Sequence, residues 1–178
     1  MLREAGVAVD GPEYIALTAW TTDELLDAID DAKPRGPYGL VTLLVGVNDQ
    51  YRARPAQTFI VTFNAVLRRA ISLAGRRVSR VVVLSIPDWG ATPYAAGRDA
   101  AAIGRDIDEY NALARTLVIE RGAAWVDVTT VSRGMRSDPA LVVEDGLHPS
   151  GALYAEWARL AAPAAMKAFR GRGAERRG

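Results

Sequence analysis

The residues best suited to chemistry lie in one short loop, at Asp145, Gly146, Leu147, His148 and Pro149. His148 is the only histidine in the sequence, and Asp145 precedes it by three positions. A loop of this form can hold a carboxylate against one imidazole nitrogen and leave the other free to transfer protons. These residues predict the base and the orienting carboxylate of a Ser-His-Asp hydrolase. The simpler alternative is a packing or surface histidine beside an aspartate that caps the next helix.

A second candidate, Asn48, follows the continuous apolar run at residues 40–45. Such a run is typical of a buried parallel strand, and an amide at its carboxyl end can face a crevice as a hydrogen-bond donor. The alternative is an ordinary turn, since Gly46, Asn48 and Asp49 are turn-forming residues. Asp49 is predicted to hold this loop through backbone hydrogen bonds rather than to act as a base.

Alternating strands and helices must position these residues. Strands are predicted at residues 13–17, 40–45, 80–86 and 123–127, and helices at residues 22–32, 55–74, 103–121 and 150–169. Thr21 and Glu24 have the spacing of a capping box for the first of these helices. This order predicts one α/β domain over residues 1–169, a three-layer α/β/α open parallel sheet. Ala19, Asn48, Asp88 and the His148 loop all follow predicted strands, where such sheets carry their sites.

The composition excludes several classes of protein. With no cysteine there can be no disulfide, thiolate nucleophile or thiolate metal site. A net charge of +1 predicts no nucleic-acid partner, and the basic residues 170–178 are expected to form a disordered tail. The sequence contains no run of eighteen apolar residues, so no transmembrane helix is predicted. The first residues lack the apolar core of a signal peptide, so the chain as given is expected to be cytoplasmic, with compartment and oligomeric state left open.

Four segments together resemble the SGNH (GDSL-type) hydrolases. Gly46-Val-Asn-Asp49 and Asp145-Gly-Leu-His-Pro149 resemble blocks III and V of that family, Thr18 to Glu24 resembles block II, and Ile86 to Gly90 resembles the segment after a later strand. The resemblance implies a flavodoxin-like strand order and ester hydrolysis through a serine acyl-enzyme, without cofactor or metal. It also implies that His148 is the base with Asp145 as its partner. Asn48 and the backbone N–H of Ala19, which stands where glycine is usual, would bind the oxyanion.

The family's nucleophile, the serine of a Gly-Asp-Ser motif after the first strand, has no counterpart in this sequence. We therefore expect the central first strand to be absent from this chain and the domain to be incomplete at its N-terminus. Residues 1–6 are predicted to be the end of a helix stopped by Gly6. The strands at 13–17 and 40–45 would flank an empty slot or pair directly. Ser85, near the carboxyl end of a predicted strand, is the one candidate for a substitute nucleophile.

The leading functional prediction is an esterase acting on a small-molecule ester; acyl esters, lysophospholipids and thioesters all remain open as substrates. The rival is a non-catalytic α/β domain that binds a ligand or partner, which the missing serine favours. Upstream DNA encoding a strand and Gly-Asp-Ser would decide for the enzyme. A flavodoxin-like phosphate binder is disfavoured, because no Gly-rich loop follows any predicted strand.

Overall fold

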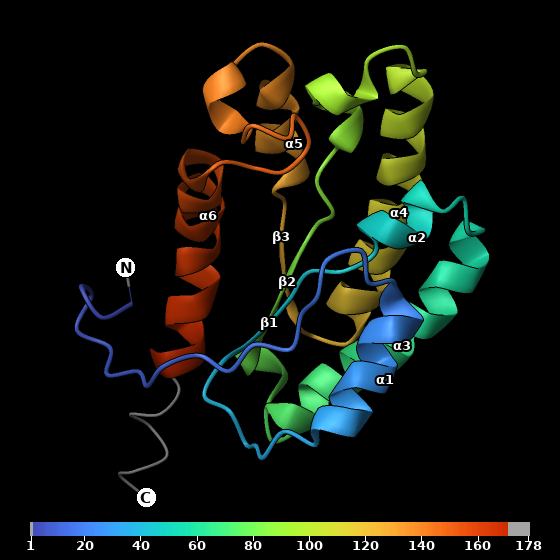
Figure 1. Ribbon diagram of the computed structural model, residues 1–178. Coiled ribbons are helices and arrows are strands. Elements are labelled where there is room, and N and C mark those ends of the chain that lie inside the picture. Colours follow the sequence, from blue (N-terminus) through green and yellow to red (C-terminus); the bar gives the residue numbers. More distant parts are fainter. Residues whose placement is uncertain (1, 171–178) are drawn as a thin grey trace, which may run out of the picture.

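The computed structural model describes residues 2–170; the predicted basic tail lies outside the described residues from position 171 onward. Its centre is a parallel sheet of β1 (Val41–Leu43), β2 (Val81–Leu84) and β3 (Ala124–Val126), in the order β1-β2-β3 (Figure 1). Val41 pairs with Val81, and Val83 pairs with Trp125. Consecutive strands are therefore neighbours, as the predicted α/β succession requires.

Helices cover both faces of this sheet. The helices described are α1 (Thr22–Ala32), α2 (Val47–Tyr51), α3 (Ala56–Leu73), α4 (Ala100–Glu120), α5 (Thr129–Ser132) and α6 (Gly151–Arg170). In Figure 1, α1, α3 and α4 lie on one side of the sheet and α6 lies on the other. None of the helices within residues 2–170 is long and apolar enough to cross a lipid bilayer. The predicted three-layer α/β/α architecture is confirmed.

Alternate residues of the central strand enter two separate cores, which explains why β2 is apolar throughout. Val83 belongs to the larger core with Phe59 and Phe63 of α3, whereas Val82 belongs to the smaller core with Trp157 of α6. All five side chains are at most 4% exposed. Because successive strand residues point to opposite faces, a strand covered on both sides needs apolar residues at every position.

The predicted strand at residues 13–17 is wrong. These residues have no regular secondary structure, and Tyr14 and Leu17 are 82% and 66% exposed. Ile15 packs against the larger core, and the Tyr38 hydroxyl donates a hydrogen bond to Glu13. A strand also needs a neighbour to satisfy its backbone groups, and the described residues supply none beside this segment. Because residues 13–17 are not a strand, both predictions for them are wrong: they neither flank an empty slot with residues 40–45 nor pair with them.

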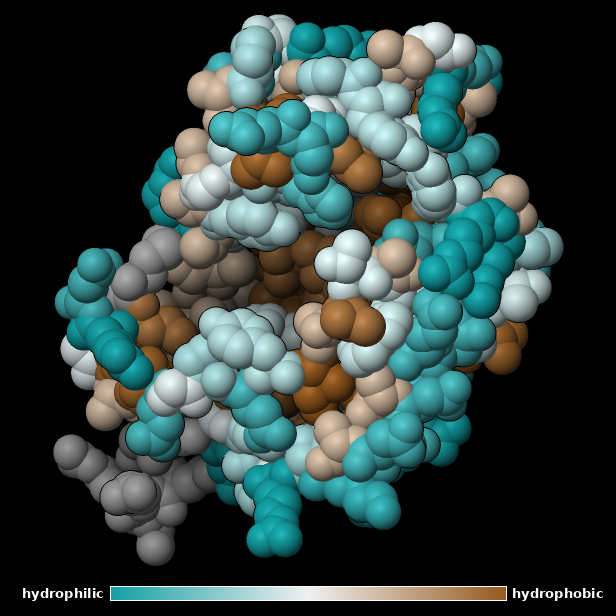
Figure 2. All heavy atoms as spheres, in the orientation of Figure 1, coloured by the Kyte–Doolittle hydropathy of each residue, from teal (hydrophilic) through white to brown (hydrophobic). Residues whose placement is uncertain are grey.

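β1 is instead an edge strand. β2 occupies one side of it, and no described strand occupies the other. Thr42 is exposed, and Leu44, just beyond the strand, is 40% exposed although it is large and apolar. Figure 2 shows the surface hollowed between α6 and the segment that leads into α1, with hydrophobic residues at the bottom of the hollow. A free strand edge beside exposed apolar side chains is a place where a further strand can pair.

The chain enters this region through a helical turn at residues 2–6. Gly6 has a φ of 79°, and the N–H of Val7 donates to the carbonyl of Leu2 at 3.0 Å. A left-handed glycine together with a backbone bond between residues five positions apart is the Schellman pattern, which is common at helix ends. Gly6 therefore ends a hydrogen-bonded turn, and the expectation that residues 1–6 are the end of a helix stays a prediction.

Candidate active site

Asp145 and His148 form a direct side-chain pair. The Nδ1 atom of His148 lies 2.6 Å from Oδ2 of Asp145, while Oδ1 of Asp145 accepts the backbone N–H groups of Leu147 and His148 at 2.8 and 2.9 Å. Both side chains are about half exposed, so solvent and small molecules can reach the ring. A carboxylate fixed by two backbone donors can orient the imidazole and leave Nε2 for proton transfer.

Gly146 makes this arrangement possible. Its φ is 70°, in the left-handed region that glycine adopts without steric cost. The turn brings the two following N–H groups back onto the Asp145 carboxylate. The carbonyl of Val143 accepts the Gly146 N–H, and the carbonyl of His148 accepts the Val143 N–H. The loop is therefore held by its own backbone as well as by the contact between the Asp145 and His148 side chains.

The Asp145 carboxyl is expected to titrate far below an ordinary aspartate. Hydrogen bonds from the His148 backbone, the His148 ring and the Leu147 backbone lower its pKa to about 2. Because the pKa is lowered in the folded chain, the Asp145 carboxylate stabilises the fold at pH values above 3.8, its pKa in the unfolded chain. This stabilisation is lost as the pH falls toward 2. Carboxyl carbon NMR should give a midpoint near 2 in the folded chain.

The variant His148→Ala provides the matched control for that titration. It removes the ring but keeps both backbone donors, so the midpoint should rise only part of the way to the ordinary value. A wild-type midpoint near 4 would contradict the hydrogen-bonded loop.

The short helix α2 and the residue after it make hydrogen bonds to the segment that leads into α1. Asn48 Nδ2 donates to the carbonyl of Trp20 at 2.9 Å, and Arg52 Nη2 donates to the carbonyl of Ala19 at 2.8 Å. The buried carboxylate of Asp49 accepts both the N–H and the hydroxyl of Thr22 at 2.9 and 2.8 Å. Burial raises the pKa of Asp49 even though these bonds act in the opposite direction. Asp49 therefore holds two segments together, in place of the purely local backbone bonds that we predicted.

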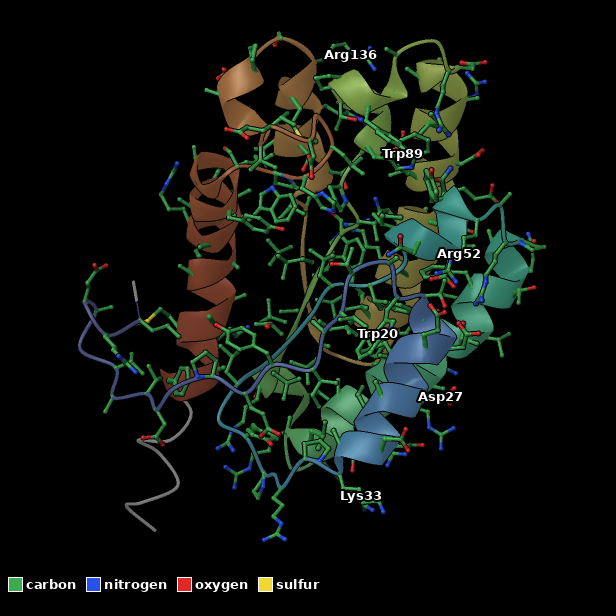
Figure 3. All side chains as sticks on the ribbon, in the orientation of Figure 1. Trp20, Asp27, Lys33, Arg52, Trp89 and Arg136 are labelled. Carbon is green, nitrogen blue, oxygen red and sulfur yellow. The ribbon has the colours of Figure 1, made fainter. Side chains whose placement is uncertain are left out.

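The two predicted oxyanion donors, Asn48 and Ala19, are thus fixed by the same contacts. An asparagine amide carries two N–H bonds, and the bond to Trp20 uses one of them. Within the described residues, no acceptor takes the Ala19 N–H. Figure 3 shows Trp20 where the chain enters α1, with Arg52 nearby. Within the described residues, Asn48 and Ala19 therefore each keep one N–H without an acceptor.

Ala19 has a φ of 70°, which an alanine adopts at a cost that glycine avoids. We expect Ala19→Gly to raise the free energy of unfolding, by up to about 1 kcal/mol, because relief of this strain exceeds the added entropy of the unfolded chain. Ala112→Gly, at an exposed position inside α4, should instead lower it by about 1 kcal/mol. Urea unfolding of both variants checks the opposite signs, and a loss of stability in Ala19→Gly would contradict the strain.

Tyr94 connects the two halves of the candidate site. Its backbone N–H donates to the carbonyl of Gly146 at 2.9 Å, in the loop of His148. Its hydroxyl lies 2.8 Å from the hydroxyl of Tyr51, the last residue of α2. The helix that carries Asn48 and the loop that carries His148 therefore contact one tyrosine. Our expectation that the Asn48 and His148 side chains lie within about 10 Å, near enough to serve one tetrahedral centre, stays a prediction.

Ser85 does not have the surroundings of a nucleophile. It is 1% exposed, and its oxygen accepts the N–H groups of Val128 and Thr129 at 2.8 and 3.0 Å. The Thr129 hydroxyl lies 2.7 Å from the same oxygen. These bonds tie the end of β2 to the turn after β3. The hydroxyl is therefore fixed inside the protein, without access to a substrate.

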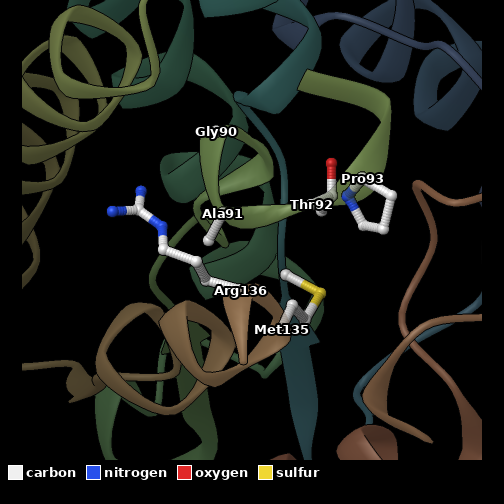
Figure 4. A pocket seen from close by; sticks show the side chains of 6 residues that line it. All are labelled: Gly90, Ala91, Thr92, Pro93, Met135 and Arg136. Carbon is white, nitrogen blue, oxygen red and sulfur yellow. The ribbon is translucent and has the colours of Figure 1, made fainter. Parts of the chain in front are cut away.

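A small hollow of about 150 Å³ lies between the segment at 90–93 and the turn at Met135 and Arg136 (Figure 4). It is below the several hundred cubic ångströms typical of ligand pockets. None of Asn48, Asp145 and His148 lines it. No group of three acidic, histidine or cysteine side chains within residues 2–170 is arranged to hold a metal ion.

Sequence reasoning missed two parts of this site. Arg52 was not predicted, although its spacing of four from Asn48 places both on one side of a helix. The aromatic side chains of Tyr51, Trp89 and Tyr94 contact one another, and Tyr94 bonds to the His148 loop; none of the three was predicted as part of the site. The helix α2 itself was read as a turn, which concealed both relations.

An Asp-His pair beyond the strands of a parallel α/β/α sheet is an arrangement that hydrolases of several folds use. The family model described as GDSL-like Lipase/Acylhydrolase family matches residues 2–156, so the chain belongs to this family. No curated protein matches the chain.

Two solved structures share the fold. A GDSL-like lipase from Bacteroides thetaiotaomicron VPI-5482 is 18% identical, with a TM-score of 0.59, over 94% of this chain and 79% of its own. An acetyl xylan esterase from Geobacillus stearothermophilus is 19% identical, with a TM-score of 0.55, over 83% of this chain and 68% of its own. The predicted family and fold class are confirmed.

Proposed function

We propose that this domain hydrolyses acyl esters by a serine acyl-enzyme mechanism, with His148 as base and then acid. The observation that supports this most directly is the 2.6 Å contact between His148 Nδ1 and the Asp145 carboxylate, which leaves Nε2 for the nucleophile. Membership of a lipase and acylhydrolase family supports the same reaction class. An acyl ester of a small alcohol or a sugar is the substrate class that we infer.

The proposed steps use His148, Asn48 and Ala19 together with a serine that the described residues do not supply. His148 Nε2 takes the proton of a serine hydroxyl as that oxygen bonds to the ester carbonyl carbon. The negative charge that develops on the carbonyl oxygen is bound by the free N–H of Asn48 and the backbone N–H of Ala19. Collapse expels the alcohol, which takes the proton from His148, and water then releases the acid by the same sequence.

We infer that the serine comes from a segment other than residues 2–170. Ser85 is buried and acts as a hydrogen-bond acceptor. The free edge of β1 and the adjoining hollow are the sites where we infer that a strand carrying Gly-Asp-Ser would pair. By this proposal the chain as given is inactive, and it acquires activity when that strand is supplied.

The second candidate is a domain that binds esters without cleaving them. The absence of a nucleophile context for any serine in the sequence favours it. A fluorophosphonate probe separates the two candidates, because it reacts covalently with activated serines. We expect a form extended by a Gly-Asp-Ser strand to gain one adduct on the new serine, located by peptide mass spectrometry, and the same form with that serine changed to alanine to gain none. No labelling of the extended form would favour the binding domain.

A further inference from the structure

One cation beside the candidate site packs against three aromatic rings. The guanidinium carbon of Arg98 lies 5.7, 5.4 and 5.2 Å from the ring centroids of Tyr51, Trp89 and Tyr94. The three rings also contact one another, with centroids 5.2 to 6.5 Å apart. Trp89, labelled in Figure 3, is buried and fixed by a 2.7 Å bond from its Nε1 to Gln50 of α2. The three rings therefore form a packed aromatic surface on which the exposed Arg98 side chain lies.

This arginine cluster, made of Arg98 and the three rings, borders both halves of the proposed catalytic centre. Tyr51 lies three residues after Asn48 on α2, so the two side chains are neighbours on one helix. Tyr94 donates its backbone N–H to Gly146, between Asp145 and His148. A molecule bound between Asn48 and His148 would thus have the cluster at one end.

Arg98 also donates to the Tyr51 hydroxyl and thereby helps to lower the pKa of that group, but it has no acidic partner among the described residues. No carboxylate among residues 2–170 lies within ion-pair distance of it, in contrast to Arg52, Arg54 and Arg133, which all have acidic partners. Stacking on rings uses the face of a guanidinium, and the N–H groups that bind anions lie along its edge. That edge matches a carboxylate or phosphate with two parallel hydrogen bonds. Holding the fork in place beforehand also lowers the entropy lost when an anion binds.

The adjoining hydroxyl groups suit the same ligand. Tyr51 and Tyr94 are 42% and 40% exposed, and their hydroxyls lie 2.8 Å apart. One of these hydroxyls donates to the other, and the second proton of the pair is then free to reach a ligand. A cation and a hydroxyl donor on one surface complement negative charge.

We propose that the arginine cluster is an anion-recognising subsite, which selects esters bearing a carboxylate or phosphate over neutral esters. The inference rests on the proposed ester hydrolase function for its substrate class, but it is tested by binding alone. The negative group belongs either to the acyl part or to the alcohol part of the ester. Two anionic probes distinguish these sources, monomethyl succinate for the acyl side and 2-acetoxyethyl phosphate for the alcohol side.

The experiment is isothermal titration of the 178-residue chain with both anionic probes and with neutral 2-acetoxyethanol at low ionic strength. We expect at least one anionic probe to bind about fivefold more tightly than the neutral ester, and salt to weaken that preference. Arg98→Gln should abolish the preference. Arg98→Lys should retain part of it, because the charge remains while the fork is lost. Arg115→Gln, at an exposed position on α4, removes a charge elsewhere and should change nothing.

Two results would overturn the subsite: equal affinity of the wild-type chain for charged and neutral probes, including no binding of any, or a preference that survives Arg98→Gln. Failure of the proposed function is separate, because it appears as an extended form that binds these esters but neither hydrolyses them nor reacts with fluorophosphonate. If the extended form hydrolyses neutral esters and shows no preference for anionic ones, the proposed subsite is wrong and the proposed hydrolase function stands.

Discussion

A strand bearing Gly-Asp-Ser, joined ahead of this chain with its following loop and helix, is expected to turn an inactive protein into one that hydrolyses p-nitrophenyl acetate. The 178-residue chain should show only the background rate. The physical reason is that β1 offers an unpaired edge beside a hollow with hydrophobic residues at its bottom, while the helical turn at residues 2–6 supplies a point of attachment. The extended form should also be more soluble, because pairing covers the edge and Leu44.

Two controls make this result specific. The extended form with its new serine changed to alanine should return to background, which excludes an effect of solubility alone. Ser85→Ala in the extended form should leave the reaction intact if the protein folds, since Ser85 serves as a buried acceptor. Hydrolysis by the unextended chain that disappears in Ser85→Ala would show that the nucleophile was misassigned.

Loss of the His148 ring is expected to have the second large effect. In the extended form, His148→Ala should lower kcat by about 10³-fold or more, because the serine then has no base. Asp145→Asn should lower kcat by a comparable factor, since an amide cannot stabilise the imidazolium and favours the wrong tautomer. KM should change much less, as neither side chain is assigned to substrate binding.

Steady-state kinetics at several pH values measure these losses, with Arg115→Gln as a control far from the site in sequence. A double variant of His148 and Asp145 should be little worse than His148→Ala, because residues that act as one unit are not additive. Retained activity in His148→Ala would place the base elsewhere and remove the central element of the proposed function.

The sequence predicted the layers and the Asp145–His148 pair well because both depend on local information. Apolar runs such as residues 80–86 and the capping box of Thr21 and Glu24 are set by burial and by spacing along the chain. The three-residue spacing of Asp145 and His148 similarly fixes their contact within one loop. Ala19 stands where the family usually has glycine, and its φ of 70° is one that glycine adopts without strain.

The failures have a common cause, which is that they depend on partners distant in sequence. Residues 13–17 have the composition of a strand, but pairing needs a neighbour that the described chain does not place beside them. The hydrogen bonds between Asp49 and Thr22 join residues 27 positions apart in the sequence. The contact of Arg98 with Tyr51 joins the loop before α4 to the helix α2. No pattern within a short window contains such contacts.

The helix α2 has a consequence for how changes combine. Through Asn48 and Asp49, and through Arg52 directly after it, this helix of only five residues fixes the backbone from Ala19 to Thr22. The side-chain donor of Asn48 and the backbone donor of Ala19 therefore share one support, so that any displacement of α2 moves both relative to a ligand. Substitutions at Asp49 and Arg52 should be thermodynamically coupled, and a second change should cost less than its effect alone. The two donors then constitute one mechanical unit, gained or lost together.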